Sequence, residues 1–184
     1  MEHHANAAAD GTPQLAVDLI PTARQTVVRT LPACAVAIIG IPLLAWFTPR
    51  DTSELRTPWE LLIVLAALGL FPLIHRLTRA PRPRIDDVGR AQWKRALASA
   101  ARTRSLPSNP QVRTATGVIA CTSIEAFMMV TAILLGTLLG EIVRPEFSWS
   151  LPVGGAMALA IGFAFRLRSS WSYLSVLHAE AQGS

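Results

Sequence analysis

Glu125 is the residue whose type and position could carry chemistry, because it is an acid inside a long apolar stretch. Burying a charged acid at the centre of a membrane helix costs about 2.5–3.5 kcal/mol on insertion scales. A carboxyl group in such a place can hold a proton and release it when a substrate or partner arrives. At about 3.6 residues per helical turn, Cys121 and Thr122 share the face of Glu125. These three residues form a candidate proton or cation site, or a helix-packing site.

Small residues extend this face toward the end of the same stretch, at Ala132, Gly136 and Gly140. The spacing of Gly136 and Gly140 is one at which two helices can approach closely. The opposite face carries bulky side chains, at Phe127, Val130, Leu134 and Leu138. The bulky face is therefore expected to meet lipid, and Glu125 to point into a helix bundle or a subunit interface. Gly136 and Gly140 are the predicted helix-packing residues.

Two interpretations of Glu125 remain open. The first is a proton- or cation-coupled transport site, since small four-span multidrug transporters also use one membrane glutamate. The resemblance to those transporters ends there, because this chain is longer, carries a basic connection of about forty residues and has its glutamate in the third apolar stretch. The second is a protonated or hydrogen-bonded glutamate that holds helices together through Thr122, Ser123 or a backbone carbonyl.

Patterns typical of catalysis or metal binding do not occur in the sequence. It contains no Gly-x-Ser-x-Gly, no His-Glu-x-x-His and no phosphate-binding glycine loop. The two cysteines, Cys34 and Cys121, lie in apolar stretches and are expected to be small buried side chains. His75 is expected at the inner membrane surface, as an interfacial residue or a proton acceptor. The remaining histidines are too scattered to predict a metal site. Because the catalytic patterns are absent as well, we predict no enzyme and no cofactor.

Four apolar stretches surround these residues, at about residues 31–47, 59–75, 117–140 and 151–167. A helix rises about 1.5 Å per residue, so each stretch is long enough to span a hydrocarbon core about 30 Å thick. The sequence therefore predicts an all-α membrane protein whose four transmembrane helices form two helical hairpins. A soluble helical bundle is the alternative, and the nearly uncharged third stretch argues against it.

The distribution of positive charge predicts the orientation of these spans. The net charge is +5, and fourteen of the seventeen Lys and Arg residues lie before the first stretch, between the second and third, or at and after the end of the fourth. Positive charge near the ends of spans is retained in the cytoplasm. We therefore predict a multi-pass protein of the inner cell membrane with both termini cytoplasmic.

These predictions divide the chain into five segments. A mobile cytoplasmic tail and a short cytoplasmic tail are expected at the two ends, with two hairpins separated by a basic cytoplasmic connection between them. In chain order the segments are residues 1–20, 21–79, 80–109, 110–178 and 179–184.

The basic connection has the pattern of an amphipathic helix from about residue 86 to 104. Its apolar side holds Val88, Trp93, Ala96, Leu97, Ala100 and Ala101. Its candidate lipid-headgroup residues are Arg90, Lys94, Arg95, Arg102 and Arg104. Such a helix can lie on an anionic leaflet, or it can be a solvated helix or a cover over the bundle. Aromatic residues are scarce here, so no nucleic-acid partner is expected.

The end of this connection resembles a known stretch. Residues 102–113 read Arg-Thr-Arg-Ser-Leu-Pro-Ser-Asn-Pro-Gln-Val-Arg. They are similar to an Arg-Thr-Gly-x-Leu-Pro-x-Asp-Pro-x-x-Arg pattern that joins spans in small, uncharacterised actinobacterial-type membrane proteins. Arg104 and Asn109 stand where that pattern has Gly and Asp. The resemblance implies a four-span fold and no activity. Independently of it, Asn109 is predicted to cap a helix that begins at Pro110.

Three functional hypotheses follow. The leading one is a non-enzymatic structural, accessory or regulatory membrane component that associates through its third helix, with itself or with another membrane protein. The second is a small proton- or cation-coupled transporter that uses Glu125. The third is a sensor of anionic lipid surfaces that uses the central basic helix.

Overall fold

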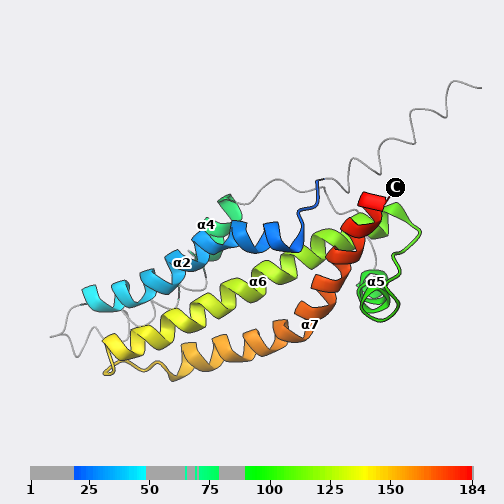
Figure 1. The fold of residues 1–184 in the computed structure, drawn as a ribbon. Helices are drawn as coiled ribbons and strands as arrows, with labels where there is room; N and C mark the ends of the chain where they lie inside the picture. The colour runs from blue at the N-terminus through cyan, green and yellow to red at the C-terminus, as the bar shows by residue number, and fades with distance from the viewer. Residues whose placement is uncertain (1–18, 49–64, 66–68, 70, 79–89, 184) are drawn as a thin grey trace, which may run out of the picture. The chain divides into compact units, whose positions relative to one another are not determined.

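The computed structural model describes residues 19–48, 65, 69, 71–78 and 90–183. Of these residues 87% are helical, and none of them forms a strand. The helices are α2 (Ala23–Phe47), α4 (Phe71–Thr78), α5 (Arg90–Thr103), α6 (Pro110–Val143) and α7 (Ser150–Gly183), as Figure 1 shows. The all-α fold class is confirmed.

Three of these helices, α2, α6 and α7, are long and apolar enough to cross a membrane. They contain the first, third and fourth predicted spans. Most of the second predicted span lies outside the described residues, apart from α4 and two single positions. Half of the most apolar part of α6 is buried, against 28% for α2 and 6% for α7. α6 is therefore the most enclosed of the three.

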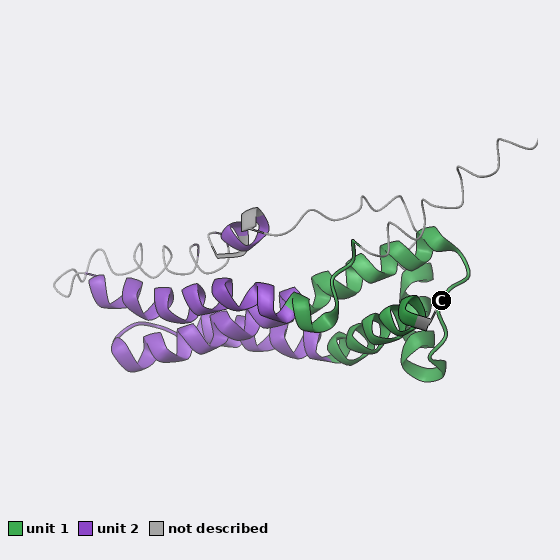
Figure 2. Cartoon of the chain, turned by 45° about the horizontal axis from the view of Figure 1, so that its top comes forward, with its two compact units in different colours: residues 1–26, 80–124, 165–184 green, residues 27–79, 125–164 purple. Residues whose placement is uncertain are grey.

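The chain forms two compact units, which Figure 2 colours separately. Unit 1 comprises residues 1–26, 80–124 and 165–184, and unit 2 comprises residues 27–79 and 125–164. The charge divides unequally between them. Unit 1 contains eleven basic and six acidic residues, whereas unit 2 contains six of each. The whole net charge of +5 therefore belongs to unit 1.

Unit 2 holds a hydrophobic cluster of buried residues. Its buried members come from α2, from α6, from the segment that joins α6 to α7, and from α7 itself. They are Ala33, Cys34, Ala37, Ile41, Ala45, Met129, Ala132, Ile133, Phe147, Trp149 and Ala156. The many alanines let α2 and α6 lie close together, because small side chains allow helix backbones to approach.

Unit 1 is held together by buried side chains and by polar contacts to backbone carbonyls. The Tyr173 hydroxyl donates a hydrogen bond of 3.0 Å to the Arg113 carbonyl. The two ring nitrogens of His178 lie 2.8 Å and 3.0 Å from the carbonyl oxygens of Leu174 and Ile20. α7 continues through this unit to Gly183, so residues 179–183, expected as a tail, are helical.

Local sequence signals explain where α2 and α6 begin. The Thr22 and Gln25 side chains accept hydrogen bonds from each other's backbone N–H groups, at 3.2 Å and 3.0 Å, which is a capping box. Asn109 accepts a hydrogen bond of 2.9 Å from the Gln111 N–H and stands directly before Pro110, as predicted. α2 contains Pro32 and Pro42, which the structure accommodates within one helix.

The residue directly after α5 has an unusual backbone conformation. Arg104 has a φ of 53°, in the left-handed region that glycine adopts without steric cost. This is the position at which the resembled pattern has Gly. The arginine side chain therefore imposes a conformational penalty at the turn between α5 and α6.

Replacing Arg104 by glycine is expected to stabilise the protein by about 1 kcal/mol, because a left-handed non-glycine residue costs about 1–2 kcal/mol. The matched control is Arg102→Gly, which removes the same charge from inside α5 and should destabilise by about 1 kcal/mol. Thermal unfolding of the purified proteins in mild detergent would compare them. Equal changes in the two variants would contradict the role assigned to the backbone of Arg104.

Candidate functional site

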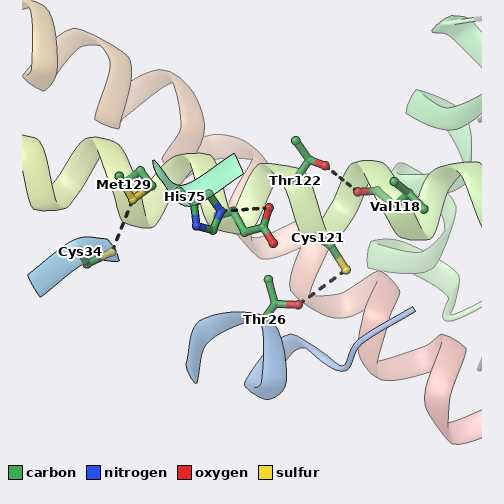
Figure 3. Close-up of polar contacts among 8 residues, drawn as sticks. Thr26, Cys34, His75, Val118, Cys121, Thr122 and Met129 are labelled. Atoms are coloured by element: carbon green, nitrogen blue, oxygen red, sulfur yellow. Dashed lines mark hydrogen bonds and ion pairs between the residues drawn. The ribbon is translucent and has the colours of Figure 1, made fainter. Parts of the chain in front are cut away.

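The carboxylate of Glu125 lies against the imidazole of His75 in unit 2. Oε2 of Glu125, on α6, is 3.5 Å from Nε2 of His75, on α4 (Figure 3). The two side chains are only 8% and 14% exposed. A carboxyl group and an imidazole that share one proton carry no net charge in either arrangement of that proton. This pairing lowers the cost of burying an acid in an apolar environment.

Nothing in the sequence pattern pairs these two residues. The sequence predicts His75 at the inner membrane surface, as an interfacial residue or a proton acceptor, whereas the structure places it beside Glu125. One signal was available: each of these residues is an ionisable side chain within or at the end of an apolar stretch. An isolated ionisable group there is costly, so two of them are more stable together.

The face of α6 that contains Glu125 is buried along its length, with one exception among the candidate residues. Cys121, Met129 and Ala132 are buried, as the helical spacing predicts. Thr122, which was expected on this face, is exposed, and its hydroxyl donates a hydrogen bond of 2.9 Å to the Val118 carbonyl. A step of three residues turns a helix by about 300°, so Thr122 lies at the margin of the face of Glu125.

Each cysteine has a polar or sulfur neighbour within its own unit (Figure 3). In unit 1, Cys121 Sγ lies 3.7 Å from Thr26 Oγ1 and 3.6 Å from the Pro21 carbonyl oxygen. In unit 2, Cys34 Sγ lies 4.0 Å from Met129 Sδ. Neither cysteine is in a disulfide. Among the described residues, no group of three or more His, Cys, Asp and Glu residues is placed to hold a metal ion.

Gly136 and Gly140 pack against parts of the same chain. A Cβ at Gly136 would lie 2.8 Å from the Ala37 carbonyl oxygen and 2.9 Å from Ile41 Cδ1, both on α2. A Cβ at Gly140 would lie 2.6 Å from the ring of Trp149. These two glycines therefore pack within the chain.

The segment between α6 and α7 is organised by Arg144. This side chain is 3% exposed, donates a hydrogen bond of 2.9 Å to the Thr48 carbonyl, and pairs with Glu146 at 2.6 Å. Its guanidinium lies 4.9 Å from the centre of the Phe147 ring, a cation–π distance. The Trp149 indole donates to the Arg144 carbonyl at 2.9 Å. Trp149 is thus a buried packing residue of unit 2.

The candidate lipid-headgroup residues lie on α5 and directly after it. Lys94, Arg95, Arg102 and Arg104 are exposed, and Arg90 is the first residue of α5. On the apolar side of the helix, Ala96, Leu97 and Ala100 are buried, whereas Ala101 is exposed. The buried alanine and leucine side chains are covered within the chain, so the basic side is the part of α5 that is open to a partner.

α7 differs from α6 in having glycines with open surroundings. A Cβ at Gly154, Gly155 or Gly162 would have no described neighbour within 4 Å. Large apolar side chains on the same helix are exposed, among them Leu151, Ile161 and Phe165. In a bilayer, such a surface is stable in contact with lipid.

The function of this site rests on its geometry. No family model matches the chain, and neither the curated proteins nor the solved structures contain a significant match to it.

Proposed function

We propose that this chain is a non-enzymatic, four-span component of the inner membrane, with both termini and the basic connection in the cytoplasm. The observation that carries the proposal is that the polar and small residues of α6 contact other parts of the same chain. Its acid lies against His75, and its glycines lie against α2 and Trp149. The residues best suited to chemistry or assembly are therefore engaged in holding this chain together, as expected of a structural or accessory protein.

The charge distribution supports the proposed orientation. Unit 1 carries the entire net positive charge and contains the predicted cytoplasmic tails and connection. Positively charged segments beside spans stay on the cytoplasmic side. The exposed basic side chains of α5 would then face the anionic inner leaflet and contact its lipid headgroups.

A proton- or cation-coupled transporter is the second candidate, and the contact between His75 and Glu125 is the observation in its favour. A buried carboxylate beside an imidazole can pass a proton from one group to the other. In a transporter, this proton would move in response to substrate. In the structural component that we propose, it would stay within the pair.

The test that separates the two functions uses Glu125→Gln, which keeps hydrogen-bonding capacity and cannot ionise. Wild-type and variant proteins would be reconstituted in vesicles that contain a pH-sensitive dye, and an imposed pH gradient would be followed before and after Na⁺ or K⁺ is added as a candidate coupled cation. We expect the gradient to decay at the same rate with both proteins. Faster decay that depends on wild-type Glu125 would overturn the structural function in favour of transport.

A further inference from the structure

We propose that Cys34 and Met129 form a binding site for a soft monovalent metal ion, of the class of Cu(I) and Ag(I). The two residues come from different helices of unit 2, α2 and α6, and both are buried. Their sulfur atoms lie 4.0 Å apart, with the thiol of Cys34 directed at the thioether of Met129 (Figure 3). Thiolate and thioether sulfurs are soft ligands, which favour Cu(I), zinc and iron–sulfur clusters over harder metal ions.

The separation of the sulfurs suits a bridging ion. A metal–thiolate bond is about 2.3 Å long for zinc, and two bonds of that length at the observed separation would meet at an angle of about 120°. That angle belongs to trigonal coordination, with one position open beside the two sulfurs. The ion would take the place now held by the thiol proton. Cys34–SH and the ion would form one sulfur–metal bond, and the proton would be released to solvent.

Charge balance favours a monovalent ion at this place. A thiolate with one monovalent cation is neutral, whereas a divalent ion would leave a net positive charge in an apolar environment. Uncompensated buried charge is strongly unfavourable. Glu125 lies one helical turn before Met129, but its carboxylate is in contact with His75. The neutral complex of Cys34, Met129 and a soft monovalent ion needs no further counter-charge.

The site is independent of the function proposed above, and it can be tested with Ag(I), which does not change oxidation state under ordinary conditions. All proteins would carry Cys121→Ala, so that Cys34 is the remaining thiol of the chain. Ag(I) would be titrated into the full-length protein in mild detergent, in competition with a small-molecule thioether. We expect one ion per chain and the release of one proton per ion.

Two methionine variants decide whether the site is built as proposed. Met129→Leu conserves side-chain volume, so the protein should remain folded while it loses a ligand. We expect its affinity for Ag(I) to fall by about tenfold or more, the loss typical when even an outer partner of a metal site is removed. Met128→Leu, at the neighbouring position on α6, is the matched control and should bind as the parent protein does.

Equal affinity of the Met129→Leu and Met128→Leu proteins would overturn the proposal, because the thiol alone would then explain the binding. Binding that survives Cys34→Ala would overturn it as well, since the ion would have to lie elsewhere. The unfolding temperature of each variant without metal shows whether a loss of Ag(I) affinity arises from misfolding. If Met129→Leu unfolds at a much lower temperature than the parent protein, Met129→Ile would replace it, and the same loss of affinity is expected.

Discussion

Replacing Gly136 by leucine is expected to lower the free energy of unfolding by about 3 kcal/mol, the upper end of the usual cost of overpacking a core. The reason is that a side chain at this position would collide with the backbone of α2. The nearest atom to a Cβ at this position, at 2.8 Å, is the backbone carbonyl oxygen of Ala37, which cannot rotate away as a flexible side chain could. α2 and α6 would have to separate along unit 2, and the buried cluster between them would lose contacts.

The matched control for this variant is Gly154→Leu. It makes the same chemical change in another apolar helix, where a Cβ would have no described neighbour within 4 Å. We expect the control to stabilise the protein by up to about 1 kcal/mol, because leucine favours a helix interior over glycine and meets no obstacle at this open position. Thermal unfolding in mild detergent would measure both. A similar cost at the two positions would mean that close approach of α2 to Gly136 is not what stabilises unit 2.

A double-mutant cycle on His75 and Glu125 is expected to show a favourable coupling of about 1–2 kcal/mol, within the range of about 0.5–3 kcal/mol usual for residues in direct contact. His75→Phe keeps an aromatic ring in the same volume and removes the nitrogen that faces the carboxylate. Its cost should be largest with Glu125 present, because burying that acid then becomes less favourable. In the Glu125→Gln background the same substitution should cost less.

The free energy of unfolding of wild type, both single variants and the double variant would be measured in detergent. Glu141→Gln is the control, because Glu141 is an exposed acid near the end of the same helix. Combined with His75→Phe, it should give an additive result. Additivity for the Glu125 pair as well would refute an energetic role for the 3.5 Å contact.

Helix type and the buried face of α6 could be read from the sequence because both follow from spacing along one helix. Cys121, Glu125, Met129 and Ala132 recur at intervals of three or four residues, and all four are buried. Asn109 was predicted as a cap for a similarly local reason, since its side chain bonds to a backbone group two residues away. The same reasoning placed Thr122 on that face, but Thr122 is exposed. It lies at the margin of the face, where a small difference in angle around the helix axis decides whether a side chain is buried.

The contacts between helices could not be read in this way, because they join residues far apart in the chain. His75 and Glu125 are fifty positions apart, and neither local sequence specifies the other as a neighbour. The hydrogen bond from Arg144 to the Thr48 carbonyl likewise depends on how two chain segments meet.

By itself, the sequence determined that this protein is helical, with apolar segments long enough to cross a membrane and positive charge concentrated beside them, since helical period, hydropathy and charge are local properties. Tertiary structure alone decided which partners the candidate site and packing residues contact. It directed Gly136 and Gly140 to partners within the chain, placed His75 against Glu125 and brought the sulfurs of Cys34 and Met129 together. The physical reason is that a helix specifies which side chains share a face, whereas packing selects the helix that the face will meet.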